Sequence, residues 1–260
     1  RKKRSDLGIF YTPHYIVDYI VRNTVGGWVK GKSVEEILKI KILDPSCGSG
    51  RFLVSSFNLL CKEIESRGVV LDREIKKRIL GCLYGIDLDD KAIVLTRKNL
   101  AFSSGLGIWL ENVRFGNALI DNVFTFNFDV IIGGPPYGAY FTRDQEEFLA
   151  KKFNLGDVGS AVLFSGLARN LVVSGGFVGM VVPKAFVNGR GWKLVRKEFL
   201  NGLLELVDCG RAWPEVKLEE IIFIYRNLYS HSYKVKKRKN KEFLFLQNIS
   251  KRDCFVKEGL

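Results

Sequence analysis

Apolar runs alternate along the chain with segments in which apolar residues recur every three or four positions. Short apolar or β-branched runs indicate buried strands, whereas the longer spacing indicates helices with one buried face. Strands are therefore expected at residues 39–43, 81–86, 112–115, 128–132, 176–182, 203–207 and 220–225. Helices are expected at residues 13–23, 52–64, 89–102, 161–173 and 191–200. This alternation predicts an α/β fold, a doubly wound, mostly parallel sheet with helices on both faces.

The pattern changes near Tyr229, where the strand–helix alternation gives way to a basic segment. Residues 234–241 read KVKKRKNK. We therefore predict one domain over residues 1–228 and the edge of a second unit over residues 229–260. A solvated, charged face is the alternative explanation for the basic run.

Composition and charge limit the class of protein. The chain has 260 residues, of which 47% are hydrophobic and 27% charged, a globular composition that excludes a disordered or fibrous chain. Lys and Arg total 41 against 28 Asp and Glu, a formal net charge of +13. This balance favours a polyanionic partner, most often nucleic acid, unless the host's proteins are basic in general. No apolar stretch is long enough to cross a bilayer and no apolar signal region follows residues 1–4, so we expect a cytoplasmic protein without membrane contact.

The five cysteines are scattered, and none forms a Cys-x-x-Cys pair. With only two histidines in the chain, a structural metal site is not expected. The cysteines are interpreted as reduced core thiols of an intracellular protein.

The first candidate site is the turn Asp44-Pro45-Ser46-Cys47-Gly48-Ser49-Gly50, which lies where a predicted strand becomes a helix. In open α/β sheets, ligands bind at the carboxyl ends of strands. Gly48 and Gly50 allow the backbone to approach a ligand closely, and the following helix offers free N–H groups to an anion. A tight turn without a ligand is the alternative.

Two more strand ends carry polar side chains, Asp87 after Gly85-Ile86 and Asn117 after Phe115-Gly116. An acidic residue at the end of the second strand typically hydrogen-bonds ribose hydroxyls, and Asp87 is assigned that role. An amide at the next strand end would face the base of a bound nucleoside. A surface turn acid and a turn-forming Asn are the respective alternatives, while Asp89 and Asp90 are expected to cap the next helix.

The fourth predicted strand, residues 128–132, runs directly into Gly133-Gly134-Pro135-Pro136-Tyr137. Two prolines fix the backbone, and an aromatic ring follows at the edge of the sheet. This arrangement suggests a platform on which a planar group stacks.

With these segments in this order, the chain resembles the gamma-class N6-adenine DNA methyltransferases, as in type I modification subunits and fused type IIG restriction–modification enzymes. Residues 8–13, GIFYTP, look like the family's N-terminal cofactor motif, and residues 44–50 look like its Asp-Pro-x-Cys-Gly-Ser-Gly motif. Residues 133–138 resemble its Asn-Pro-Pro-Tyr motif. The similarity runs from about Gly8 to Arg226. It implies a seven-stranded, Rossmann-like sheet and S-adenosylmethionine as the cofactor.

The resemblance also implies a role for each motif. The methionine end of the cofactor would be held by Thr12, Asp44, Pro45, Cys47, Gly48 and Gly50, and Tyr11 would also belong to the cofactor site. Asp87 would bind the cofactor's ribose, Asn117 its adenine, and Pro135 would line it. The catalytic turn would be Gly134, Pro135, Pro136 and Tyr137, with Tyr137 and Trp213 stacking on the flipped target adenine.

The sequence departs from the family at position 134, where Gly134 replaces an Asn, Asp or Ser whose side chain accepts a hydrogen from the target amine. The Pro135 carbonyl would remain as the other acceptor. An engineered inactive variant, a natural degenerate copy, and an active enzyme with a water in place of the amide are the three interpretations.

The implied partner is double-stranded DNA, from which the target base must be flipped before it can react. The implied target-recognition domain or specificity subunit is missing from this chain, although residues 229–260 would be the start of a recognition region. Structured RNA or a protein glutamine is the alternative substrate within the enzyme class. A non-catalytic module that binds cofactor or DNA is the alternative outside it.

Overall fold

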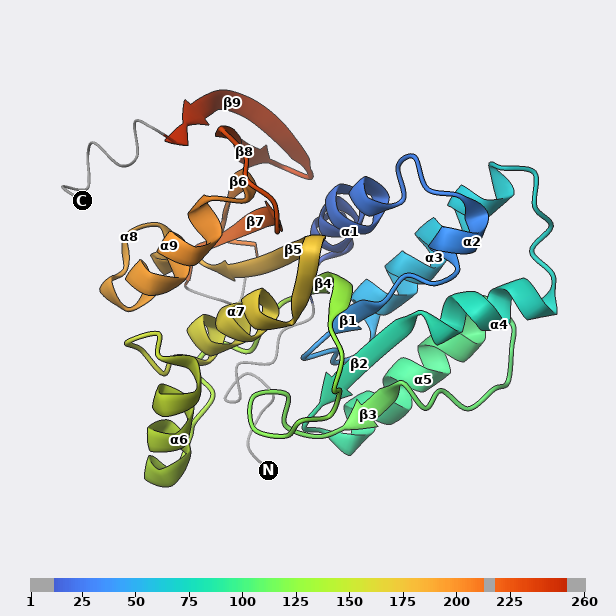
Figure 1. The fold of residues 1–260 in the computed structure, drawn as a ribbon, viewed down its shortest axis with the longest axis horizontal. Coiled ribbons are helices and arrows are strands. Elements are labelled where there is room, and N and C mark those ends of the chain that lie inside the picture. Colours follow the sequence, from blue (N-terminus) through green and yellow to red (C-terminus); the bar gives the residue numbers. More distant parts are fainter. Residues whose placement is uncertain (1–11, 213–217, 252–260) are drawn as a thin grey trace.

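The chain is described by a computed structural model over residues 12–212 and 218–251. Its centre is one nine-stranded sheet in the order β3-β2-β1-β4-β5-β7-β6-β8-β9 (Figure 1). The strands are β1 (Ile42–Asp44), β2 (Leu83–Asp87), β3 (Val113–Phe115), β4 (Phe128–Gly133), β5 (Val172–Pro183), β6 (Leu203–Gly210), β7 (Glu220–Arg226), β8 (Ser232–Lys239) and β9 (Glu242–Ser250). The first seven lie within a few residues of the segments expected from the apolar runs.

Helices cover both faces of the sheet, as the alternation predicts. One face packs against α1 (His14–Trp28), α2 (Val34–Ile37), α3 (Arg51–Glu65), α4 (Arg73–Gly81) and α5 (Asp90–Ser104). The other packs against α6 (Arg143–Phe153), α7 (Ser160–Leu171), α8 (Ala185–Asn188), the 3₁₀ turn Arg190–Trp192 and α9 (Lys193–Leu200). Alternate residues of each central strand enter the two cores: Ile222 and Ile224 of β7 face the first core, whereas Phe223 faces the second.

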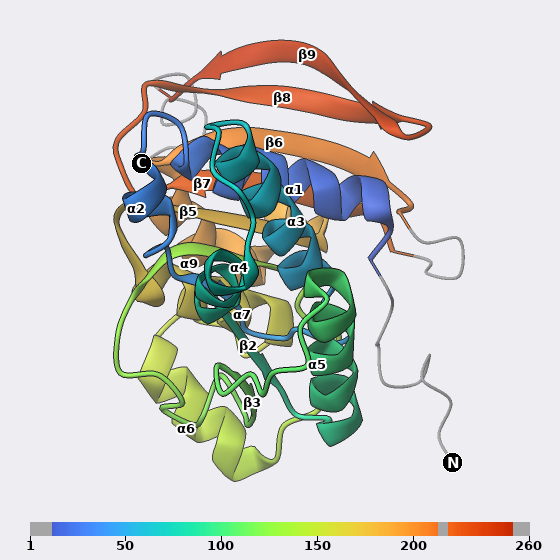
Figure 2. The ribbon, with the colours of Figure 1, turned by 90° about the vertical axis from the view of Figure 1, so that its right-hand side faces the viewer.

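The sheet is mixed and nine-stranded, which corrects the expected seven strands. β3, β2, β1, β4 and β5 run parallel, β7 is antiparallel to both β5 and β6, and β8 pairs parallel with β6. β9 completes an antiparallel hairpin with β8 at the end of the sheet opposite β3 (Figure 2). The position near Tyr229 at which a domain boundary is predicted therefore lies between two strands of the same sheet.

Three side chains of the basic run attach this hairpin to the rest of the sheet, and one of them is Lys234, whose Nζ lies 3.9 Å from Glu205 Oε1. Lys236 Nζ donates to both carboxylate oxygens of Glu205 at 3.0 Å and to the Tyr19 hydroxyl at 2.9 Å. Arg238 donates to the backbone carbonyls of Cys209 and Arg211 at 2.6 and 2.8 Å. Glu205 neutralises Lys236, backbone carbonyls accept from Arg238, and pairing with β6 and β9 makes the run a strand that was not predicted from the sequence.

α1 lies unusually close to the sheet. A Cβ at Gly179 of β5 would lie 2.6 Å from Thr24 Cγ2 and 2.8 Å from Ile20 Cγ2, so only glycine permits this approach. The approach places the N-terminal end of α1 at the carboxyl edge of the sheet, next to β4 and β5.

Cys47, Cys61, Cys82 and Cys209 are buried free thiols, as expected, and Cys254 lies outside the described residues. Across residues 12–212 and 218–251, no helix has both the length and the apolar character needed to cross a bilayer.

Candidate active site

The predicted site residues lie at neighbouring strand ends. β1 lies between β2 and β4 in the sheet, and all three run in the same direction. Asp44, Asp87 and Gly133 are the last residues of these three strands. Tertiary structure thus brings the glycine turn, the second-strand acid and the proline turn to one edge of the sheet.

The glycine turn is shaped by α5. Gly50 has φ of +78°, and a Cβ there would lie 2.7 Å from Thr96 Cγ2, so the position requires glycine. Thr96 Oγ1 donates to the Gly48 carbonyl at 2.9 Å, and Asn99 Nδ2 donates to the Ser49 carbonyl at 2.9 Å. Two helix side chains therefore hold the turn's carbonyls, which leaves its other side for a ligand. Thr96 and Asn99 carry no signal in the sequence, because neither belongs to a strand-end motif.

Asp44 is a buried acid at the start of this turn, only 1% exposed. Its Oδ1 accepts a hydrogen bond from the Ser46 backbone N–H at 3.1 Å. Burial raises the pKa of Asp44 to about 8, with a smaller contribution in the same direction from Asp87, while the Ser46 N–H acts in the opposite direction. Burial makes the ionised form of this carboxyl unfavourable, and a bound cationic ligand would make it favourable again. Such perturbed carboxyls are typical of functional sites.

The two side chains that follow in the turn differ in orientation. Cys47 packs into the core: its Sγ would lie 3.1 Å from a Cβ at Gly85, and burial raises its thiol pKa well above the ordinary value. Only its backbone is therefore placed for the cofactor role implied by the resemblance. Ser46 Oγ is buried and has no hydrogen-bond partner within the described residues. A buried hydroxyl without a partner is costly, so a ligand group at this position is favoured.

Asp87 holds the glycine turn in place. Its Oδ2 accepts from the Gly48 N–H at 2.8 Å, and its Oδ1 accepts from the Asp89 N–H at 2.9 Å. Burial raises the Asp87 pKa, while these N–H groups act to lower it. Each oxygen keeps a further acceptor site, so these contacts leave room for ribose hydroxyls. Asp89 caps α5 through Lys91 N–H, as expected.

Asn117 forms a turn after β3. Its Oδ1 accepts from the Leu119 N–H at 3.0 Å, and its own N–H donates to Asp121 at 2.7 Å. The side-chain oxygen is thus committed to the turn. The Asn117 amide nitrogen is the group that remains for a nucleoside base.

The proline turn is anchored to the second helix layer and to β5. Ser160, the first residue of α7, donates its hydroxyl to the Pro136 carbonyl at 2.6 Å. The Tyr137 hydroxyl donates to the Val181 carbonyl at 3.1 Å, and burial raises the pKa of Tyr137 well above its ordinary value. The ring is therefore held through its hydroxyl, and the turn that carries it is held through Pro136. Pro135 is buried, and no described residue donates a hydrogen bond to its carbonyl.

Position 134 is enclosed by two side chains. A Cβ at Gly134 would lie 3.1 Å from Val181 Cγ1 and 3.2 Å from Thr12 Oγ1. Thr12 is 8% exposed, so the structure places this predicted cofactor residue beside the proline turn. Tyr11 and Trp213 lie outside the described residues.

The sequence analysis also missed Glu220, the first residue of β7, which is fully buried. Its Oε2 accepts from the Ala212 N–H at 2.8 Å, whereas Oε1 has no partner within the described residues. Burial raises its pKa to about 7. Glu220 pairs with Pro183 and Gly210 across the sheet, so it anchors the loop leading to residue 213 at the same edge as the site.

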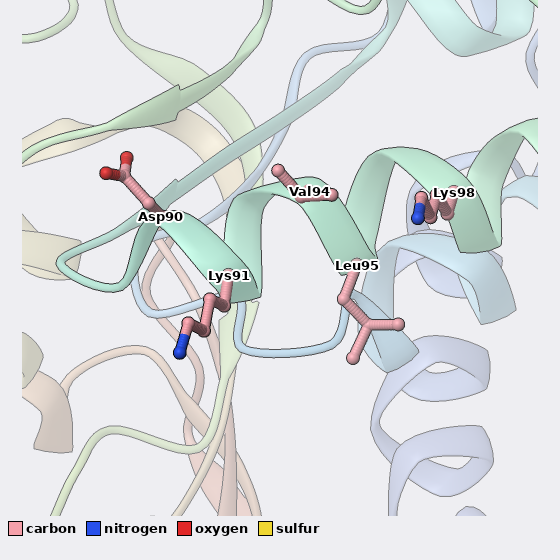
Figure 3. A pocket seen from close by; sticks show the side chains of 5 residues that line it. All are labelled: Asp90, Lys91, Val94, Leu95 and Lys98. Atoms are coloured by element: carbon pink, nitrogen blue, oxygen red, sulfur yellow. The ribbon is translucent and has the colours of Figure 1, made fainter.

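A separate hollow of about 380 Å³ lies along α5 (Figure 3). Asp90, Lys91, Val94, Leu95 and Lys98 line it, and all are side chains of that helix. None of the residues predicted for the site lines this hollow.

Comparison with known proteins identifies the family of the chain. The family model described as N-6 DNA Methylase matches residues 1–199. The chain belongs to the N-6 DNA methylase family. It is 28% identical over 250 residues to the type II restriction enzyme and methyltransferase RM.Eco57I of Escherichia coli, an alignment covering 76% of this chain and 25% of that protein. The chain therefore spans a quarter of the length of this relative.

Solved structures show the same fold at low identity. A nuclease-deletion mutant of the type ISP restriction–modification enzyme LlaGI, in complex with a DNA substrate mimic, superposes with a TM-score of 0.70 at 16% identity, covering 88% of this chain and 27% of that chain. A class I S-adenosylmethionine-dependent methyltransferase from Listeria monocytogenes superposes with a TM-score of 0.63 at 21% identity, covering 91% and 69%. The fold is that of S-adenosylmethionine-dependent methyltransferases, as expected.

S-adenosylmethionine is the cofactor that this family and fold imply, and the residues present fit it. Asp44 is a buried carboxyl suited to a cation, and no described residue hydrogen-bonds Ser46 Oγ. No described atom lies within 4 Å of a Cβ built at Gly48, which leaves open space beside the turn.

Proposed function

We propose that this domain transfers a methyl group from S-adenosylmethionine to the N6 amine of an adenine flipped out of DNA. One observation carries the proposal: Asp44 Oδ1 lies 2.9 Å from a Cβ built on Gly133. The buried carboxyl of the cofactor turn therefore touches the strand end that begins the proline turn. Methyl transfer requires the donor and the amine to be held side by side.

In this proposal, Asp44 and the turn from Pro45 to Gly50 hold the methionine end of the cofactor. Asp87 accepts hydrogen bonds from the ribose, and Asn117 contacts the adenine of the cofactor. The cofactor supplies an electrophilic methyl group on a positively charged sulfur.

The proline turn holds the substrate. The target adenine stacks on Tyr137, whose ring is held by its hydrogen bond to β5. Base stacking on an aromatic side chain contributes about 1–3 kcal/mol, which offsets the cost of removing the base from the duplex. The Pro135 carbonyl accepts one N6 hydrogen. With Asp44 and Asp87 holding the cofactor, its methyl group would pass to the N6 lone pair, the electron pair of the broken C–S bond would stay on sulfur, and one N6 proton would leave to solvent.

The chain covers a quarter of RM.Eco57I. We therefore also propose, for the whole protein, that DNA is the substrate. A target-recognition domain or specificity subunit is proposed as the partner that selects the sequence. The net charge of +13 is consistent with a DNA partner.

Two measurements test the function. Calorimetry should show micromolar binding of S-adenosylmethionine, and transfer of a tritiated methyl group to plasmid DNA should yield N6-methyladenine. Label recovered in RNA or in protein glutamine instead of DNA would contradict the proposed substrate.

Gly134 favours a second candidate, a module that binds cofactor and DNA without turnover. Glycine supplies no side-chain acceptor for the amine. Cofactor binding without methyl transfer, both in the chain with Gly134 and in Gly134→Asn, would support this candidate against the enzyme.

A further inference from the structure

A hydroxyl lies where a side chain at position 134 would reach. Among the described residues, only Val181 Cγ1 and Thr12 Oγ1 come within 4 Å of a Cβ built on Gly134, at 3.1 and 3.2 Å. Val181 is apolar and fully buried. Thr12 Oγ1 is therefore the polar atom that borders the space left by the glycine.

Thr12 is held in this place by one direct hydrogen bond and by the anchoring of the helix that follows it. Arg51 Nη1, at the start of α3, donates to the Thr12 carbonyl at 3.0 Å. The next residue, Pro13, accepts the first hydrogen bonds of α1, from the N–H groups of Ile16 and Val17. α1 itself is fixed against β5 by its close approach at Gly179. The backbone that carries the Thr12 hydroxyl is therefore positioned by two helices and the sheet.

The Thr12 side chain is nearly buried, yet no described residue hydrogen-bonds its hydroxyl. A threonine hydroxyl donates one hydrogen bond and accepts up to two. It can therefore accept a hydrogen from an amine and still donate its own proton to a bound anion. The role in holding the cofactor that the resemblance implies for Thr12 remains compatible with a second contact.

We propose that the Thr12 hydroxyl, in place of a side chain at position 134, accepts a hydrogen from the N6 amine of the target adenine. This inference rests on the proposed function. The Thr12 hydroxyl and the Pro135 carbonyl then form the two acceptors around the amine. An acceptor fixed in this way directs the nitrogen lone pair towards the methyl group and costs no rearrangement during the reaction.

The test compares Thr12→Val, which keeps the shape and removes the hydroxyl, with Thr12→Ser, which keeps the hydroxyl. The DNA probe is a duplex with the site at which the protein, or Gly134→Asn, places N6-methyladenine in plasmid DNA. A second duplex carries purine, which is adenine without its amine, at the target position. Binding of both duplexes is measured by fluorescence anisotropy, single-turnover transfer by quenched flow, and cofactor affinity by calorimetry.

We expect Thr12→Val to lower the preference for adenine over purine about fivefold to tenfold, the net value of one hydrogen bond. Its single-turnover rate should fall at least about tenfold, since a preorganised acceptor is lost. Thr12→Ser should recover most of both losses. In a Gly134→Asn background the effect of Thr12→Val should shrink, because the amide then supplies the acceptor.

An unchanged adenine preference in Thr12→Val would overturn the inference, even if cofactor affinity fell, because Thr12 would then act on the cofactor alone. The inference would also be overturned if the chain with Gly134 transferred no methyl group while Gly134→Asn was active. The proposed function would then still stand. If neither the natural chain nor Gly134→Asn methylated DNA, the proposed function would fail and the inference with it.

Discussion

The carboxylate of Asp87 accepts a hydrogen bond from the backbone N–H of Gly48 at 2.8 Å, across 39 residues of chain. The acid expected to bind ribose therefore also shapes the turn expected to bind the methionine end. Loss of the Asp87 side chain should consequently disturb two parts of the cofactor site at once.

We predict that Asp87→Ala weakens S-adenosylmethionine binding by about 1–3 kcal/mol, because hydrogen bonds to a charged acceptor are lost. Calorimetry with S-adenosylhomocysteine and its 2′,3′-dideoxy analogue separates the two roles. A ribose contact requires the variant to lose the natural chain's preference for the hydroxylated ligand. If both ligands weakened equally, Asp87 would act only on the turn.

Asp44 should make cofactor binding depend on pH. Its pKa is about 8 without a ligand, so near neutral pH the carboxyl is mostly protonated. A cationic ligand favours the ionised form, so binding should release up to one proton and affinity should rise from pH 6 to pH 8. Calorimetry in buffers of different ionisation enthalpy measures that proton. Asp44→Asn should bind more weakly with a flatter profile, and a flat profile in the natural chain would contradict the assignment.

The same residue should lower the stability of the cofactor-free protein at high pH. The ordinary Asp pKa is 3.8, and the folded value is about 8, so the folded state binds more protons than the unfolded state between these values. The contribution of Asp44 to the free energy of unfolding is therefore fully present below about pH 4, and it is lost as the pH rises towards 8. Asp44→Asn, which keeps an oxygen for the Ser46 N–H, should therefore raise the melting temperature at pH 8 more than at pH 5. Equal shifts at both pH values would argue against a buried ionisable carboxyl.

Gly134→Asn should raise the rate of methyl transfer at least about tenfold, because an amide acceptor next to Pro135 strengthens its hydrogen bond in the transition state. Gly134→Ala is the matched control: its Cβ meets the same Val181 and Thr12 atoms but brings no acceptor. Both variants should bind cofactor nearly as well as the natural chain. Equal transfer rates for the natural chain and Gly134→Asn would show that an acceptor at this position is not needed.

Two adjacent lysines of the basic run should behave differently. Lys236 is paired with Glu205, whose side chain is 9% exposed, so Lys236→Ala should destabilise the fold by about 2–3 kcal/mol in urea unfolding. Lys237 is exposed, and Lys237→Ala should change stability by less than about 0.5 kcal/mol. If Lys237 contacts a phosphate, its loss should reduce the slope of log affinity against log salt by about one. If Lys237→Ala destabilised the fold and Lys236→Ala did not, the register of β8 would be contradicted.

The sequence alone determined the helices and strands that bury one or both of their faces in the core. The β-branched run after Phe128 predicted β4, and its direct continuation into Pro135 and Pro136 located the turn. The glycine turn after Asp44 was likewise visible, because a strand followed at once by glycines and a helix is a local signal. Local periodicity records which side of a segment is buried, and that is enough to order strands, helices and their ends.

Only the tertiary structure decided which partners those segments meet. β8 is mostly basic, with only Tyr233 and Val235 apolar; it is a strand through backbone pairing with β6 and β9, and Lys236 meets Glu205 and Tyr19, which lies 217 residues away. The two turns of the site are held by three helix side chains, those of Thr96, Asn99 and Ser160. Nothing in the sequence of these helices indicates that role. The Thr12 hydroxyl lies next to Gly134 only because α1 packs closely on β5. A sequence specifies such contacts only through the whole fold, because the free energy of a polar contact depends on the distant atoms that complete it and on the water they exclude.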